Sequence, residues 1–394
     1  MPRRRLPPSS GGTLGLWRVA TTLVLTLALV VQGCRFTGPA AALSPVPRDS
    51  TPRLRVCRSL ETCDGTVRLT YLGVSGFLME ADSDVLMTAP SLTHPRLLAV
   101  ATPFWPIHSD SAVVDGALHR LLGADFGLLS RVHSILIGHA HYDHLMDVPL
   151  LARHFTPRAR LYGTVTTKRT LMGDAYFREH AERVDSLMPA DSAIGTPSHV
   201  GRWSYSPSRR MRFMAIRSSH ARNWWFITLA PCVEKKDRGS LPRTGWGWCR
   251  GEPVSYVIDL LNDSGRPTFR IFYQDAASHP ADVRLPPFEL ADQRPVDLAI
   301  VCAGNFKKVE QYPTYLITSL HPSFIILAHW EDFFQEQDDS PTPISRTDTR
   351  ELAARLDLLG KNRWLTPVPG GRIVMEYDRL QSAQSPGGRD GPKR

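Results

Sequence analysis

The segment Ser134-Ile-Leu-Ile-Gly-His-Ala-His-Tyr-Asp-His144 decides how this chain folds. Its apolar half, Ile135 to Gly138, is too short for a core helix and predicts a buried strand of a layered α/β core. The residues that follow, Leu145 to Phe155, predict a helix with Asp147 and Pro149 in its first turn. The histidine-rich half therefore lies on a strand-to-helix loop, where open α/β architectures place functional groups.

This loop carries His139, His141, Asp143 and His144, which put three imidazoles and one carboxylate within six residues. Imidazole nitrogens and carboxylate oxygens are the ligands that Zn²⁺ and similar cations take in proteins. Two tetrahedral sites that share a bridge need about seven such groups, so the motif predicts a metal site completed by other parts of the chain. The alternative is a histidine-rich surface loop, which the buried strand before the motif disfavours.

Groups able to complete the site follow three later strands. They are His220 after the strand predicted at 211–217, Asp275 after the second strand of a hairpin predicted at 256–261 and 268–273, and His329 after the strand predicted at 324–327. Each alone would be an ordinary loop residue. Together with the motif they make a set of seven ligands.

The rest of the chain predicts alternating strands and helices. Residues 67–88 alternate apolar and polar side chains, which is typical of a hairpin, and 90–106 predict a proline-rich loop. Helices are expected at 112–130, 167–180 and 349–359, and short strands at 160–162, 296–302, 363–365 and 373–377.

The N-terminus predicts export. Basic residues precede an apolar run from Val19 to Val31, and Gln32-Gly-Cys34 resembles the lipobox of bacterial lipoproteins. We expect residues 1–33 to be a signal peptide, Cys34 to carry the lipid, and 34–65 to be a tether. The alternative is an uncleaved N-terminal anchor. Either way, the protein is expected in the bacterial cell envelope, bound to the membrane.

Composition bounds the remaining possibilities. The 394 residues are 42% hydrophobic, enough for a substantial core, which we expect at 66–378, and 379–394 predict a disordered tail. The formal charge of +9 falls to +5 without the four arginines of 1–33. Basic residues form no dense stripe with aromatics, so nucleic acid is not favoured.

The six cysteines fit an oxidising compartment. With Cys34 assigned to lipid, Cys302 lies in an apolar run and predicts a small buried thiol. The others form two candidate local disulfides, Cys57 with Cys63 and Cys232 with Cys249.

From about residue 67 to 377 the chain resembles the metallo-β-lactamase superfamily. The matching motifs are His139 to Leu145, His220-Ala-Arg222, Trp246-Gly-Trp248, Pro295 to Ile300, and Ala328-His-Trp330 followed by Phe333. They are most similar to the branch that contains N-acyl-phosphatidylethanolamine phospholipase D and the L-ascorbate-6-phosphate lactonase. The resemblance implies an α/β fold, an αββα sandwich of two mixed β-sheets flanked by helices, and a hydrolase domain over 66–378.

The resemblance also implies a role for each ligand of a dinuclear centre. His139, His141 and His220 would hold one divalent cation, Asp143, His144 and His329 the second, and Asp275 would bridge them. Zinc is expected, with manganese or iron as alternatives. Two such ions lower the pKa of a shared water, so hydroxide becomes available near neutral pH.

The function implied is that of a membrane-tethered hydrolase of a phosphodiester, including a lipid-derived one, or of a related ester or lactone. Asp143, Asp275 and Arg222 are the candidate catalytic residues, and Arg222 can hold a phosphate or carboxylate or instead form a structural ion pair. Two alternatives are a non-catalytic envelope scaffold and redox chemistry on a di-iron site. The chain departs from the family at Thr88-Ala-Pro90, where this branch usually has an Asp-Pro that supports the metal loop.

Overall fold

The computed structural model describes most of the chain between residues 43 and 379, namely 43–57, 63–187, 194–223, 228–286, 294–336, 341–345 and 347–379. The expected signal peptide, Cys34 and nearly all of the expected tail lie outside the described residues. Within the described ranges, no helix has both the length and the apolar character needed to cross a bilayer.

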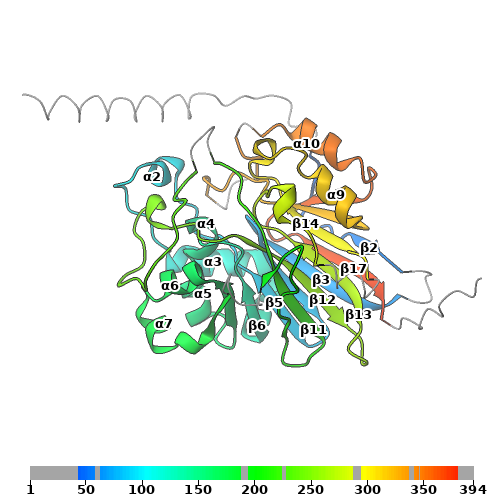
Figure 1. Ribbon diagram of the computed structural model, residues 1–394, viewed down its shortest axis with the longest axis horizontal. Helices are drawn as coiled ribbons and strands as arrows, with labels where there is room; N and C mark the ends of the chain where they lie inside the picture. Colours follow the sequence, from blue (N-terminus) through cyan, green and yellow to red (C-terminus); the bar gives the residue numbers. More distant parts are fainter. Residues whose placement is uncertain are drawn as a thin grey trace, which may run out of the picture. The chain divides into compact units, whose positions relative to one another are not determined.

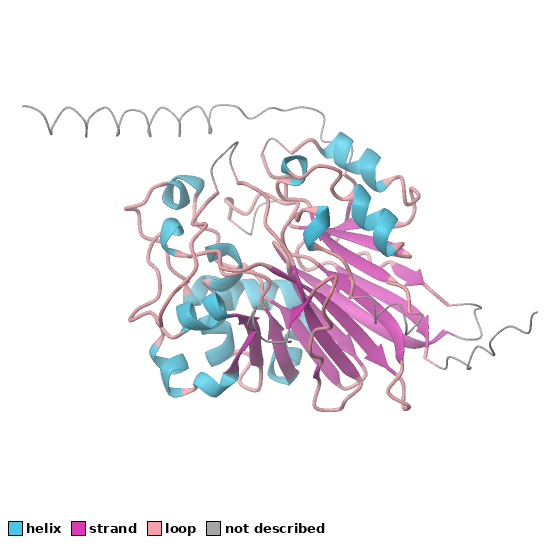
Figure 2. Ribbon diagram, in the orientation of Figure 1, coloured by secondary structure: helices cyan, strands magenta, loops and turns pink. Residues whose placement is uncertain are grey.

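Two mixed sheets pack face to face with helices outside them (Figures 1 and 2). One sheet has the order β2 (Arg53–Arg55), β17 (Arg372–Asp378), β3 (Cys63–Gly73), β4 (Gly76–Ala81), β5 (Asp84–Thr88), β6 (Val132–Leu136), β7 (Arg160–Thr164) and β8 (Val184–Leu187). The other has the order β1 (Pro45–Val46), β16 (Trp364–Pro367), β15 (Phe324–Ala328), β14 (Leu298–Cys302), β13 (Pro267–Tyr273), β12 (Val254–Leu261), β11 (Met211–Arg217) and β10 (Ser204–Tyr205), with β9 (Ile194–Gly195) beside β11. The expected sandwich of two mixed sheets is confirmed.

Helices gather into two groups on opposite sides of the strands (Figure 1). Beside β5 and β6 lie α3 (Ser111–Leu122), α4 (Tyr142–Leu145), α5 (Val148–His154), α6 (Val165–Leu171) and α7 (Ala175–Glu179), with α2 (Leu97–Ala101) further out. On the other side are α9 (Thr314–Leu320) and α10 (Thr349–Leu356). Short 3₁₀ turns connect the elements at η2 (Gly123–Arg131), η3 (Ala181–Arg183), η4 (Gly245–Gly247), η5 (Pro280–Asp282) and η6 (Phe306–Lys308).

The strand before the motif is buried on both faces. In β6 and the residue after it, Leu136 packs into the core between the sheets, whereas Ile135 and Ile137 pack into the core under the helices. This alternation is the period of two that a strand imposes on its side chains. A continuous apolar run is therefore what a central strand needs here, and it fixes where the motif begins.

The structure differs from the sequence prediction at several boundaries. The helix expected at 145–155 is α5, which begins at Val148, and the short α4 precedes it within the motif. The helix expected at 167–180 is two, α6 and α7. The Asp174 side chain accepts a hydrogen bond from the Tyr176 amide and starts α7 as a new helix. The helix expected at 112–130 ends at Leu122, where Gly123 has φ of 55°. The loop expected at 90–106 contains α2.

Part of the expected tether belongs to the sandwich. Residues 45–46 form β1 on one sheet and residues 53–55 form β2 on the other, both in parallel pairs at a sheet edge. Proline is tolerated in an edge strand because the outer side of that strand has no neighbour that needs an amide donor. The strands were therefore not predicted from a proline-rich segment. The predicted Cys57–Cys63 and Cys232–Cys249 disulfides are confirmed, and Cys302 is a buried free thiol.

A buried ion pair crosses the second sheet. Arg270 of β13 faces Asp259 of β12 and donates from Nε and Nη2 to its two carboxylate oxygens, at 2.7 and 2.9 Å. Neither side chain is exposed to solvent. Such a pair is a weak source of net stability when intact, but it is costly to break because one charge stays buried.

We expect Asp259→Ala to lower the free energy of unfolding by about 3–5 kcal/mol, because it removes the carboxylate that faces the buried Arg270. Urea denaturation measures this change. Asp263→Ala is the matched control, since Asp263 pairs with Arg210 at the surface and its side chain is 81% exposed. Equal, small effects of the two substitutions would contradict the prediction.

Candidate metal centre

The centre forms where strands of both sheets end. Gly138 follows β6, and its carbonyl accepts a hydrogen bond of 2.8 Å from the Val254 amide of β12 in the opposite sheet. A Cβ atom at Gly138 would lie 2.2 Å from Oδ2 of Asp275. Only glycine leaves room for that carboxylate behind the motif.

All seven predicted ligands come together at this point. Ligand atoms lie within 4.8 Å of one another in three groups: His139 with His141 and His220, Asp143 with His144 and His329, and His139 with His144 and Asp275. Six of these side chains are buried and His220 is half-buried. The groups share members, so they form one cluster of two triads with Asp275 between them; we call it the seven-residue cluster.

Hydrogen bonds to backbone carbonyls fix which imidazole nitrogens face the cluster. Nε2 of His141 lies 2.9 Å from the Leu229 carbonyl oxygen, and Nδ1 of His220 lies 2.5 Å from that of Ala221. A carbonyl oxygen only accepts, so each of these nitrogens carries the proton. The opposite nitrogen, Nδ1 of His141 and Nε2 of His220, is left with a lone pair, as a metal ligand requires.

Burial disfavours the protonated form of four histidines of the cluster. Burial lowers the pKa of His139 and His141 well below its ordinary value, and it lowers the pKa of His144 to about 3. Burial also lowers the pKa of His220. Neutral imidazole is the form that binds a cation, so these ligands need no deprotonation at neutral pH.

The two carboxylates differ. Burial acts to raise the pKa of Asp143, yet His144 and His329 hold it well below its ordinary range. For Asp275 burial prevails, and its pKa is raised. Asp275 lies 3.1 Å from Nδ1 of His139 and 3.6 Å from Nδ1 of His144. A cation beside Asp275 would offset the cost of burying its charge.

The cluster fits a bound cation pair. Nδ1 of His144 is buried, makes no hydrogen bond within the described part of the chain, and lies 3.6 Å from Oδ2 of Asp275. Burying a polar atom without a partner costs about 1–3 kcal/mol. Imidazole nitrogens and carboxylates such as these are the donor set that zinc, manganese or iron takes.

A buried acid that the sequence did not single out positions His329. Glu331 accepts hydrogen bonds from the Tyr71 hydroxyl, at 2.7 Å, and from the Trp330 amide, at 3.1 Å. The Tyr71 hydroxyl in turn accepts from the His329 amide at 3.0 Å. His329 has φ of 53°, a left-handed conformation that this network holds in place. The sequence offered one signal for this role, an acidic residue two positions after the predicted ligand His329.

Thr88, in the segment where the family usually has its Asp-Pro, has another role here. Thr88 donates from Oγ1 to the Ser75 carbonyl at 2.7 Å and accepts from the Phe77 amide at 2.8 Å. Behind the motif, Asp147 accepts from the amides of Leu92 and Thr93, each at 2.8 Å. Thr88 therefore ties strands together, and Asp147 anchors the loop behind the motif.

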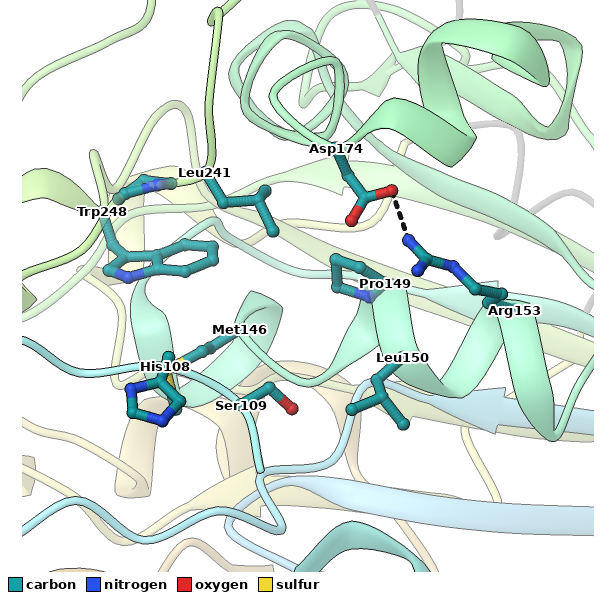
Figure 3. Close-up of a pocket in the computed structure, with 10 residues that line it drawn as sticks. His108, Ser109, Met146, Pro149, Leu150, Arg153, Asp174, Leu241 and Trp248 are labelled. Carbon is teal, nitrogen blue, oxygen red and sulfur yellow. Dashed lines mark hydrogen bonds and ion pairs between the residues drawn. The ribbon is translucent and has the colours of Figure 1, made fainter. Parts of the chain in front are cut away.

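Arg222, the candidate for substrate binding, and the tryptophans that lie near the predicted ligands in the sequence are dispersed. Arg222 is exposed, Trp330 is buried in the sandwich core, and Trp246 donates from its indole nitrogen to the Ala101 carbonyl. Trp248 lines a separate pocket beside α5, with the Arg153–Asp174 ion pair at its far side (Figure 3). No member of the seven-residue cluster lines this pocket. Trp224 and Trp225 lie outside the described residues.

In the metal-free protein, we expect His141 as the Nε2–H tautomer and His220 as the Nδ1–H tautomer, each with a pKa below that of a free imidazole. Below about pH 6.5 the unfolded chain binds protons on these histidines and the folded chain does not, so folding stability should fall as the pH falls. Long-range ¹H–¹⁵N NMR reports tautomer and charge, and thermal melts report stability. Titration of these rings near pH 6.5 would contradict the prediction.

Comparison with known proteins finds distant similarities. No family model matches the chain. A UPF0173 metal-dependent hydrolase from Polynucleobacter asymbioticus is 22% identical over 254 residues, which cover 64% of this chain and 72% of that protein. Igni18, a metallo hydrolase from Ignicoccus hospitalis, is 14% identical. The match covers 79% of this chain and 99% of the Igni18 chain, with a TM-score of 0.41.

The metallo-β-lactamase fold protein YhfI from Bacillus subtilis is 11% identical. The match covers 79% of this chain and 99% of the YhfI chain, with a TM-score of 0.40. The chain's own features are two mixed sheets between helices and the seven-residue cluster at their strand ends. These are the features that its resemblance to the metallo-β-lactamase superfamily implied, and its sequence relative carries the name of a metal-dependent hydrolase.

Proposed function

We propose that this protein is a dinuclear metal-dependent hydrolase that acts on a phosphodiester, or on a related ester or lactone. The seven-residue cluster is the observation that carries the proposal, because it offers two triads of ligand atoms with a carboxylate between them. The name of the Polynucleobacter relative, a metal-dependent hydrolase, supports the same reaction class. All seven ligands are retained, which argues against a non-catalytic scaffold.

Each triad would hold one cation, the first by His139, His141 and His220 and the second by Asp143, His144 and His329. Asp275 lies within reach of ligands from both triads. When bound, such a pair makes hydroxide available near neutral pH and stabilises negative charge on a reacting oxygen. The donor set suits zinc best, with manganese and iron as alternatives.

The chain's own residues prepare the site for this chemistry. Leu229 and Ala221 orient the rings of His141 and His220 through their carbonyl oxygens, at 2.9 and 2.5 Å. Burial lowers the pKa of His139 and of His141, so the lone pairs of these two rings are available at neutral pH. Glu331 and Tyr71 hold the His329 backbone. The ligands are thus oriented before a cation arrives, which is how a preorganised site limits the cost of binding.

We further propose that the protein is exported and anchored in the cell envelope. Two disulfides, Cys57–Cys63 and Cys232–Cys249, support an oxidising compartment. The apolar run before Cys34 supports a membrane anchor at the N-terminus.

We expect the purified protein to hold about two metal ions per chain and to hydrolyse bis-p-nitrophenyl phosphate. His141→Ala should lower the metal content and reduce kcat/KM by ~100-fold or more, because it removes a ligand of the first triad. Elemental analysis and steady-state kinetics, with a simple lactone as the second substrate, measure these changes.

His119→Ala is the matched control, since His119 lies on α3 with its side chain 59% exposed. It should change neither quantity. Metal-free protein without turnover, unaltered by His141→Ala, would refute the hydrolase.

Cys34→Ala is expected to release the protein from the membrane fraction, because the thiol is the proposed site of lipid attachment. Cell fractionation and labelling with a tagged fatty acid test this. Retention of the variant in the membrane would indicate an uncleaved anchor instead of a lipid.

A further inference from the structure

Hydrogen bonds on both sides of His220 tie its loop to the residues that follow β13. The Ser219 amide donates to Oγ of Ser278 at 2.5 Å, and the Ala221 amide donates to the Ala277 carbonyl at 2.8 Å. Residues 218–223 form neither a helix nor a strand of their own. The position of His220 therefore depends on these contacts with a segment that lies far away in the sequence.

Ser278 is at the centre of these contacts. It is fully buried, and its hydroxyl oxygen accepts from the Ser219 amide and from the Ser218 hydroxyl, the latter at 2.9 Å. A serine hydroxyl accepts two hydrogen bonds and donates one, so the Ser278 proton is directed to Oγ of Ser219, 2.9 Å away. The same Oγ accepts from the His279 amide at 2.9 Å. Ser278 thus uses its whole hydrogen-bonding capacity beside His220.

The hydrogen bonds continue to the residue before Asp275. Oγ of Ser218 accepts from the Ser255 hydroxyl at 3.1 Å, and Oγ of Ser255 accepts from Nε2 of Gln274 at 3.3 Å. All donors point the same way along this series, and hydrogen bonds arranged in this way reinforce one another in a buried site. We call the five residues the serine network: Gln274, Ser255, Ser218, Ser278 and Ser219. Its two ends directly precede Asp275 and His220 in the sequence.

We infer that Ser278 is a positioning residue for His220, because through the serine network it fixes His220 against Asp275 and so sets the affinity of the first triad for its cation. The inference rests on the proposed function and adds the residues that support one of its two metal sites. Replacing a residue that orients a metal ligand typically weakens metal binding ~10- to 100-fold. The second triad has separate support from Glu331 and Tyr71, so the loss should be confined to the first.

Hydrogen exchange in the metal-free protein is the first test. Ser278→Ala leaves the Ser219 amide without its acceptor, so the loop should loosen on both sides of His220. We expect the Ala221 amide to exchange at least ~10-fold faster, although its own acceptor, the Ala277 carbonyl, is retained. An unchanged rate at Ala221 would confine the effect to Ser219 and overturn the inference.

Ser206→Ala is the matched control. Ser206 is buried beside the other end of β11, where its Oγ accepts from the Met211 amide at 3.0 Å and lies 3.3 Å from Oγ of Ser208. This substitution removes the same kinds of contact from the same strand. It should lower the melting temperature, yet change the exchange rate of the Ala221 amide by ~2-fold or less.

Titration with ¹¹³Cd²⁺, followed by NMR in competition with a chelator, is the second test. The two sites differ in environment, because the first triad offers three imidazoles and the second offers two imidazoles and a carboxylate. Ser278→Ala should weaken the site of His139, His141 and His220 by ~10- to 100-fold and change the other by ~2-fold or less. Equal losses at both sites, or no loss at either, would refute the positioning role.

Ser219→Ala provides a second variant in case Ser278→Ala does not fold. Ser219 is half-buried, and the substitution retains its amide contact with Ser278. It should weaken the same site by ~3-fold or more and spare the other, and a loss at neither site would overturn the inference. A wild type that binds two ions but hydrolyses no substrate would refute the hydrolase alone. A wild type that turns over, with Ser278→Ala and Ser219→Ala unaltered in metal affinity, would refute the serine network alone.

Discussion

The buried carboxylate of Asp275 is the constraint on which the rest of the site depends. It is 2% exposed and its nearest charged or polar partners are imidazoles, so the fold must surround it with groups that tolerate its charge. Gly138 has no side chain because that carboxylate occupies the space. The end of β13 in one sheet and the end of β6 in the other therefore meet at a single point, and the remaining ligands converge on it.

This arrangement links the site to the stability of the sandwich. Tyr256 of β12 donates its hydroxyl proton to the carbonyls at Ile137 and Tyr162, each 3.0 Å away, across the space between the sheets. Its pKa is raised well above the ordinary value by burial, so it remains a donor. The loop that carries the ligands is thus fastened to the opposite sheet. A cation that binds the cluster would in turn stabilise the packing of the two sheets, since it binds the folded state alone.

The seven predicted ligands could be picked out from the sequence because each lies within a short recognisable pattern. His139 to His144 lie within one motif, and His220, Asp275 and His329 each follow a recognisable strand. Glu331 was not predicted because the residue that it contacts, Tyr71, lies far away in the chain. Short strands β1 and β2 were hidden by prolines, which edge positions tolerate. Helix breaks depended on single capping groups such as Asp174, whose effect only the packed structure reveals.

The disulfide between Cys232 and Cys249 limits the freedom of two segments that contact the metal motif. It closes a loop with a sequence separation of 17 residues, and the flanking residues Leu229 and Arg250 contact the motif at His141 and Ala140. A covalent link of this kind lowers the conformational entropy of the unfolded chain. Bringing both segments to the motif therefore costs less entropy when the disulfide is formed.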